Sequence, residues 1–171
     1  MKKVIIIAIC IFVTFSGCAF KKEILIPRAK IQEAISKKFP YQKDALIARL
    51  TMQTPEVYFK GKNIGLRVSY YGNFLAQEIK GFVDVYGNIT YEPETGTLYL
   101  HDFTIADITA NDNNLLEKLN LQQIIDKVAT DYLDGFPVYR LDPHDYKENL
   151  ARLLVKDIFV RNDDLVIVLG N

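Results

Sequence analysis

The hydrophobic and polar positions along the chain change period several times, and each period predicts a different element. Residues 27–39 repeat apolar side chains at helical spacing, which predicts a short N-terminal helix that ends at Pro40. Apolar and polar side chains then alternate over residues 45–53, as is typical of a half-buried strand. The same alternation predicts further strands at residues 56–60, 64–71, 77–91 and 97–108.

The longest helical pattern runs from Leu115 to Leu133, and Gly135 ends it. Its apolar stripe consists of Leu121, Ile124, Ile125, Val128, Ala129 and Tyr132. The remaining pattern predicts an extended stretch at residues 136–141, a shorter helix at 146–155 and a closing hairpin made of residues 157–160 and 165–169.

The turns between the strands indicate how the strands pair. Residues 92–96 contain the Pro and Gly that suit a hairpin loop, and Gly87-Asn88 indicates a bulge inside the strand before it. Consecutive strands with short loops imply an antiparallel sheet, and no βαβ crossover pattern is present. The order of elements therefore predicts an α+β fold in which one face of the sheet curls around the long helix.

The first seventeen residues have the three parts of a signal peptide. Lys2 and Lys3 form a positive region, Val4–Phe15 is apolar, and Ser16 and Gly17 are small. An apolar run of about a dozen residues is shorter than the roughly 20 that a transmembrane helix needs. We therefore predict that residues 1–17 are removed after export.

The tetrapeptide Phe15-Ser16-Gly17-Cys18 resembles the lipobox of bacterial lipoproteins. This resemblance predicts cleavage before Cys18, a diacylglycerol on its thiol and an acyl chain on its amine, which together make a stable membrane anchor. Cys10 lies in the removed segment, so the mature chain has no partner for a disulfide. Ala19, in the place where Asp signals inner-membrane retention, predicts an outer-membrane anchor that faces the periplasm.

Removal of residues 1–17 leaves 154 residues, which suits one domain. We expect residues 18–26 to form a lipidated tether and residues 27–171 to form a single lipid-binding-like domain. The mature chain has 19 basic and 21 acidic residues, a formal charge of −2, so nothing in its charge indicates binding to nucleic acid.

The mature chain has few reactive groups, which argues against an enzyme. Ser36 and Ser69 lie outside any Gly-x-Ser-x-Gly elbow. Side chains of His101 and Asp102 point to opposite faces of a strand, and Asp145 is expected to start a helix after His144. The sequence has no zinc, calcium or phosphate-binding motif, so we expect no metal and no cofactor.

Nearly the whole mature chain resembles the YceB-like family of small envelope lipoproteins. Besides the lipobox, the matching segments are residues 31–35, 96–100, 131–133, 137–141 and 160–169. The resemblance implies a fold similar to the tubular lipid-binding (TULIP) superfamily, in which a strongly curved antiparallel sheet wraps around a long amphipathic helix and leaves an apolar channel. A short N-terminal helix and a C-terminal hairpin would complete that fold.

The sequence therefore predicts a non-enzymatic, membrane-anchored module that binds a lipid or another apolar ligand in the cell envelope. Several strands carry large apolar side chains on both faces, which fits either plain packing or a ligand groove. The residues predicted to line such a groove are Leu50, Met52, Leu66, Val68, Val83, Val85, Ile125 and Val128. The alternative is a structural or adaptor lipoprotein that docks an envelope protein partner.

Overall fold

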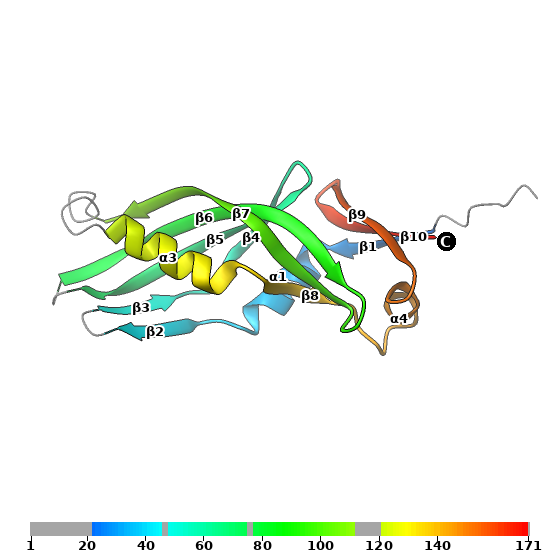
Figure 1. The fold of residues 1–171 in the computed structure, drawn as a ribbon, viewed down its shortest axis with the longest axis horizontal. Coiled ribbons are helices and arrows are strands. Elements are labelled where there is room, and N and C mark those ends of the chain that lie inside the picture. Colours follow the sequence, from blue (N-terminus) through cyan, green and yellow to red (C-terminus); the bar gives the residue numbers. More distant parts are fainter. Residues whose placement is uncertain (1–21, 46–47, 75–76, 112–120, 171) are drawn as a thin grey trace, which may run out of the picture.

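The protein folds mainly into β-strands (Figure 1). The computed structural model describes residues 22–45, 48–74, 77–111 and 121–170. The elements are β1 (Lys22–Pro27), α1 (Arg28–Ser36), β2 (Tyr41–Ala45), β3 (Ala48–Met52), β4 (Glu56–Lys60), β5 (Asn63–Phe74), β6 (Gln77–Glu92), β7 (Thr97–Ala110), α3 (Leu121–Leu133), β8 (Phe136–Arg140), α4 (Tyr146–Ala151), β9 (Val155–Arg161) and β10 (Asp164–Leu169). The predicted α+β class is therefore wrong, because ten strands and three short helices make up the described residues.

Seven strands form one antiparallel sheet in the order β2-β3-β5-β6-β7-β8, with β4 beside the first half of β5. The second half of β5 pairs with β3 instead. The longest strands, β6 with 16 residues and β7 with 14, run side by side, and the sheet curls into an open half-barrel (Figure 1).

The longest strand is bent by an irregularity that the sequence predicted. The pairing of β6 with β7 shifts register between Tyr86 and Asn88, which confirms the bulge expected at Gly87-Asn88. The hairpin loop after β6 is also confirmed, since Gly96 adopts a φ of 69° just before β7 begins.

Helix α3 lies along the curled sheet, but it is not the long central helix that was predicted (Figure 1). The prediction spanned Leu115–Leu133, the observed helix has 13 residues, and residues 112–120 lie outside the described part of the chain. A 13-residue helix is about 20 Å long, whereas a 16-residue strand such as β6 extends over about 50 Å. The helix therefore covers only part of the length of the sheet, and α1 packs against β4 and β8 beyond its end (Figure 1).

A second, three-stranded sheet has the order β1-β10-β9. Its closing hairpin confirms the prediction, and the turn places Asn162 and Asp163 at φ values of 51° and 65°. Strand β1 was not predicted, since its residues belong to the segment that was expected to be a tether. Helix α4 is shorter than predicted because the chain enters β9 at Val155.

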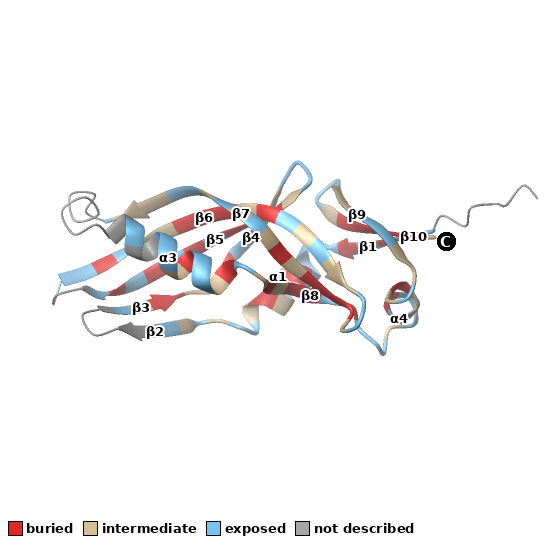
Figure 2. Cartoon of the chain, viewed as in Figure 1, coloured by how far each residue is buried: buried red, intermediate tan, exposed pale blue. Residues whose placement is uncertain are grey.

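Buried side chains form one core that runs through both sheets (Figure 2). The largest fully buried residues are Ile26, Ile31, Ile35, Ile64, Leu66, Leu98, Leu100, Leu133, Leu141, Leu165 and Ile167. Ile31 and Ile35 are one helical turn apart, so α1 presents a single apolar face to this core. Helix α1 thereby joins the two sheets, and α3 covers a separate part of the larger one.

Candidate apolar binding site

Helix α3 covers a small apolar cavity on the larger sheet. Three of its side chains, Val128, Ala129 and Leu133, face the cavity. Ala129 and Leu133 are buried and lie one helical turn apart, so they share one face of the helix. The helix therefore forms the roof of the site.

Three strands form the floor of the cavity. Val68 and Tyr70 on β5 are two residues apart, so both side chains point to the same face of the sheet. Val68 lies opposite Val83 on β6, and Tyr70 lies opposite Met52 on β3. Leu50, two residues before Met52, completes the lining. Alternation along each strand thus brings five apolar side chains to one surface.

The ring of Tyr70 is held in place by a polar contact across β6. Its hydroxyl donates a hydrogen bond to the backbone carbonyl of Thr109, at 2.7 Å. The ring crosses above Gly81, where a Cβ atom would come within 2.8 Å of the hydroxyl and 1.8 Å of the Thr109 carbonyl. Burial raises the pKa of Tyr70 to about 12. The phenol therefore stays neutral at physiological pH.

The cavity is nearly filled by its own lining. Its volume is about 10 Å³, which is room for about one water molecule. Every lining side chain is apolar apart from the hydroxyl of Tyr70, which is already bonded. Such a site favours apolar groups and offers no charged group to hold an ion or a reacting atom.

The structure brings together five of the eight residues that were predicted to line a groove. Leu50, Met52, Val68, Val83 and Val128 all line the cavity. Leu66 and Val85 lie opposite each other on β5 and β6 and are fully buried, but they belong to the core outside the cavity. Ile125 lies on α3, and its side chain is outside the described part of the structure.

Tyr70, Ala129 and Leu133 were missed as lining residues. Tyr70 has the same parity as Val68 on its strand, so the alternation contained the signal. Leu133 follows Ala129 by four residues, and extension of the predicted stripe by one turn would have included it.

Four aromatic rings pack together at the C-terminal end of α3. Tyr132 stacks on Tyr41 of β2 with ring centroids 3.9 Å apart. Phe39 and Phe136 also contact Tyr132, at 5.9 and 5.5 Å between centroids. These contacts fix the last turn of α3 against the segment after α1 and the start of β8.

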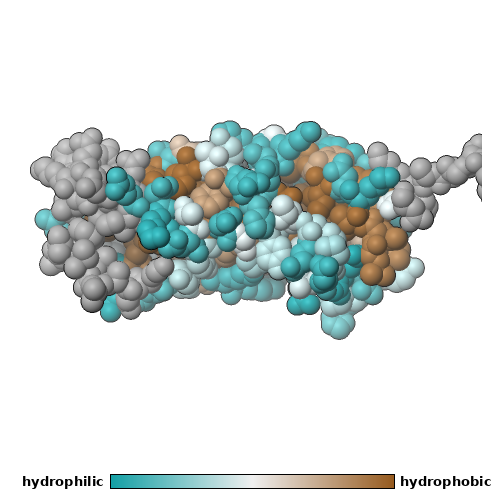
Figure 3. Space-filling view, viewed as in Figure 1, coloured by the Kyte–Doolittle hydropathy of each residue, from teal (hydrophilic) through white to brown (hydrophobic). Residues whose placement is uncertain are grey.

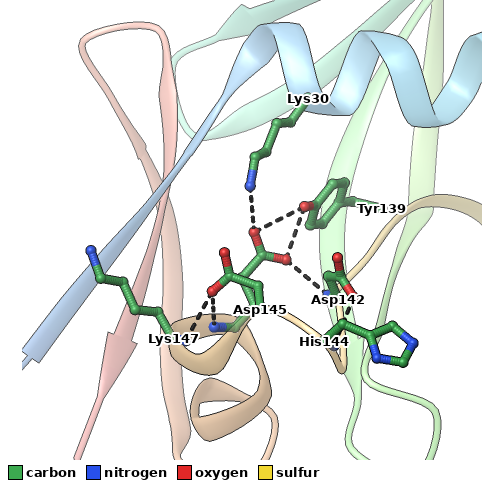
Figure 4. A network of polar contacts seen from close by, with 7 residues as sticks. Lys30, Tyr139, Asp142, His144, Asp145 and Lys147 are labelled. Atoms are coloured by element: carbon green, nitrogen blue, oxygen red, sulfur yellow. Dashed lines mark hydrogen bonds and ion pairs between the residues drawn. The ribbon is translucent and has the colours of Figure 1, made fainter.

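A buried polar network lies at the other end of the molecule, between α1, β8 and α4 (Figure 4). The carboxylate of Glu148 is 2% exposed and accepts hydrogen bonds from Lys30 Nζ at 2.8 Å, the Tyr139 hydroxyl at 2.9 Å and the Asp142 backbone N–H at 2.8 Å. The hydrogen bond to Glu148 raises the pKa of Lys30, and burial raises that of Tyr139. The carboxylate of Glu148 on α4 is therefore hydrogen-bonded to side chains of both α1 and β8, and these bonds connect the three elements.

Asp145 starts α4, as the sequence predicted. Its side chain accepts hydrogen bonds from the backbone N–H groups of Lys147 at 2.9 Å and Glu148 at 3.1 Å. The bond from Glu148 lowers the pKa of Asp145 most. His144 stands just before this cap, and its backbone N–H donates to Asp142.

The other histidine also has a local role. His101 Nδ1 lies 3.5 Å from a carboxylate oxygen of Asp134, and both side chains are partly exposed. Nearby, Asp102, Asp126 and Asp134 line a shallow cleft. Within the described ranges, no three His, Cys, Asp or Glu side chains are grouped so that they could hold a metal ion.

The predicted signal peptide and Cys18 lie outside the described residues. None of the helices that the structure describes is both long and apolar enough to span a bilayer.

A search of curated proteins found no match. One solved structure, described as the crystal structure of lipopolysaccharide binding protein, aligns with 14% sequence identity and a TM-score of 0.29. The alignment covers 91% of this chain but 42% of that one, so the chain spans less than half the length of this neighbour.

A family match covers most of the chain. The family described as "Protein of unknown function (DUF1439)" matches residues 26–164, from the end of β1 to the start of β10. This is the YceB-like family to which the sequence pointed. The chain belongs to the DUF1439 family.

Proposed function

We propose that this protein is a bacterial lipoprotein that binds a lipid or another apolar molecule between α3 and the curled sheet. It is attached through Cys18 to the outer membrane, faces the periplasm and performs no chemical reaction on its ligand. The apolar cavity under α3 is the observation that carries this proposal.

The lining of the cavity supports an apolar ligand. Val68 and Val83 form the floor and Val128 forms part of the roof, so a bound acyl chain would contact hydrocarbon on both sides. Transfer of such a chain from water is favoured by about 0.8 kcal/mol for each buried CH₂ group. The site would therefore select its ligand by apolar length and shape. The resemblance to the YceB-like family, which implies a fold similar to the tubular lipid-binding superfamily, agrees with this ligand class.

The volume of the cavity implies that α3 moves when a ligand binds. A space of about 10 Å³ is far below the roughly 300–1,000 Å³ of ordinary ligand pockets. The aromatic contacts of Tyr132 with Tyr41 and Phe136 hold the C-terminal end of α3. The helix would then pivot at this end and lift Val128 away from β5.

A binding module, rather than an enzyme, fits the state of the buried acidic groups. Glu148 is fully engaged in its network, and Asp84 accepts hydrogen bonds from Tyr58 and Arg67. Neither carboxylate lines the apolar cavity. Attachment to the membrane is supported by the lipobox-like segment that ends at Cys18.

The experiment is uptake of a fluorescent long-chain fatty acid by variants with a larger side chain in the cavity. Val128→Phe fills the space beneath α3, and Val166→Phe is the control because Val166 is equally apolar but buried in the three-stranded sheet. We expect Val128→Phe to reduce uptake while its urea unfolding midpoint stays at or above that of the control. Loss of uptake in both variants, in proportion to lost stability, would refute a specific site.

The alternative function is a structural or adaptor lipoprotein that docks an envelope protein. The small volume under α3 favours it, because a cavity filled by its own side chains needs no ligand. An adaptor would take up no fatty acid even when α3 is free to move, so the same uptake measurement separates the two functions.

A further inference from the structure

Helix α4 and the turn after it carry two exposed apolar side chains, Tyr146 and Leu153, with the half-buried Leu150 between them. These three residues are spaced by four and three positions, and we call them the α4 ridge. Helix α4 ends at Ala151, and the chain continues as a turn in which the N–H of Leu153 donates to the carbonyl of Leu150 at 3.4 Å. Leu153 is 85% exposed and Tyr146 is 80% exposed. The opposite face of α4 packs into the core.

Such exposure is uncommon among the described residues. Four large apolar residues are exposed there in all, and two of these four, Tyr146 and Leu153, belong to the α4 ridge. Figure 3 shows a hydrophobic area over the same end of the molecule, around β9 and toward α4. A surface of this kind indicates a contact with another apolar phase or molecule.

Backbone pairing places the ridge beside the start of β1. The N–H of Gly170 donates to the carbonyl of Leu154, next to Leu153, at 3.1 Å. The residue before Gly170, Leu169, pairs with Lys22 at the start of β1. Neighbouring backbones that are joined by hydrogen bonds lie about 5 Å apart. Two such steps separate Lys22 from Leu154, so Lys22 and the ridge are on the order of 10 Å apart.

The predicted anchor ends four residues before this point. Cys18 and Lys22 are separated by four peptide steps, which span at most about 14 Å when fully extended. A lipid chain on Cys18 would therefore bring this end of the domain to the surface of the bilayer. Helix α4 lies at that end, whereas α3 lies toward the opposite end (Figure 1). The cavity lies with α3, which lines it.

We propose that the α4 ridge inserts into the headgroup region of the bilayer that holds Cys18 and so fixes the orientation of the domain. This inference rests on the proposed lipidation of Cys18. Leu153 contributes apolar surface, and Tyr146 has the amphipathic ring that is favoured at membrane interfaces. Lys147, which follows Tyr146, and Lys22, at the start of β1, are both exposed and can contact lipid phosphates. The domain then stands with α3 and its cavity away from the membrane.

The absence of tryptophan from the sequence permits a direct test. Leu153→Trp places one reporter on the ridge of the acylated protein, reconstituted in phosphatidylcholine–phosphatidylglycerol vesicles with brominated acyl chains. The control is Tyr71→Trp, since Tyr71 is 50% exposed on β5 of the larger sheet. We expect blue-shifted, quenched emission from Leu153→Trp and unchanged emission from the control. Equal quenching of the two reporters, or quenching of neither, would overturn the inference.

Mass spectrometry of the N-terminal peptide separates the two possible failures. An acylated Cys18 with an unquenched Leu153→Trp would leave the anchor in place and refute membrane contact by the ridge, which would then be available to a protein partner. An unmodified Cys18 with an unquenched reporter would refute both the anchor and the inference built on it. Neither result depends on uptake of a ligand under α3.

Discussion

Val68 on β5 lies directly opposite Val83 on β6, and both side chains line the cavity beneath α3. Directly opposed residues in an antiparallel pair bring their Cβ atoms to about 5 Å, so the two valines form one continuous apolar surface. Val128 covers this surface from the helix side. A strand pair and a helix that are distant in the sequence therefore build one site, and its properties lead to the following predictions.

Cys18→Ser should abolish both lipid attachment and removal of residues 1–17. The serine hydroxyl cannot form the thioether that the lipoprotein-specific peptidase requires before cleavage. The intact mass should then include the seventeen leader residues and no acyl chains. Cys10→Ser is the control, because Cys10 lies within the apolar segment and should leave processing unchanged. Identical masses for the two variants would disprove the lipobox assignment.

Leu133→Ala should destabilise the protein and enlarge the cavity. Leu133 is 1% exposed and lines the roof, and truncation of a buried leucine costs about 2–5 kcal/mol in the free energy of unfolding. Because the space opens under α3, uptake of a fluorescent fatty acid should rise while urea stability falls. Leu165→Ala, in the three-stranded sheet, should lose similar stability without an increase in fatty-acid uptake. Increased uptake in both variants would mean that lower stability alone admits the ligand.

Tyr70→Phe should lower the free energy of unfolding by about 1 kcal/mol, since it removes the hydrogen bond that the Tyr70 hydroxyl donates to the carbonyl of Thr109. Tyr71→Phe, at the adjacent and half-exposed position, should have little effect on urea unfolding. If the two variants had equal stability, the hydrogen bond across Gly81 would contribute nothing.

The same residue predicts a loss of stability at alkaline pH. Burial raises the pKa of Tyr70 from its ordinary value of 10.0 to about 12, so the folded chain keeps this proton over a range in which the unfolded chain releases it. The stabilisation is complete below pH 10 and is lost as the pH rises from 10 to about 12. Tyr70→Phe should therefore show a shallower decline in stability over this range, and an unchanged slope would contradict the assignment.

Glu148→Ala should cost about 2–4 kcal/mol, because it leaves the Tyr139 hydroxyl and the Asp142 N–H without their acceptor and removes a link between α1 and α4. Glu33→Ala removes an ion pair with Lys37 in which both side chains are exposed, and we expect no measurable change in the unfolding midpoint. A similar small effect for Glu148→Ala would show that water replaces its partners.

The strands that the sequence identified are those with one buried face. Val68 and Tyr70 alternate with exposed neighbours, and this period predicted both β5 and its inward face. Strand β2 reads Tyr-Gln-Lys-Asp-Ala and has no such alternation, because an edge strand needs little apolar surface. Strand β1 was not recognised, because residues 18–26, next to the predicted lipidation site, were expected to form a tether. With β1 and β2 unrecognised, and with the helices at residues 27–39 and 146–155 predicted to be longer than α1 and α4 are, the predicted class was α+β.

The site was partly predictable for the same reason. Alternation along β3, β5 and β6 identified Leu50, Met52, Val68 and Val83, but nothing in the local pattern shows where α3 ends along the sheet. Leu66 and Val85 were therefore indistinguishable from lining residues. The Glu148 network was missed altogether, since its partner Lys30 is 118 residues away in the sequence and a glutamate early in a helix is usually exposed.

The most direct test of the central claim is native mass spectrometry, with solvent extraction, of residues 19–171 purified from the periplasm without the lipid anchor. The proposed function predicts one co-purifying or added lipid per chain, and less of it in Val128→Phe. A clean apo mass that takes up no added lipid would contradict ligand binding under α3 and would leave the adaptor function as the better account.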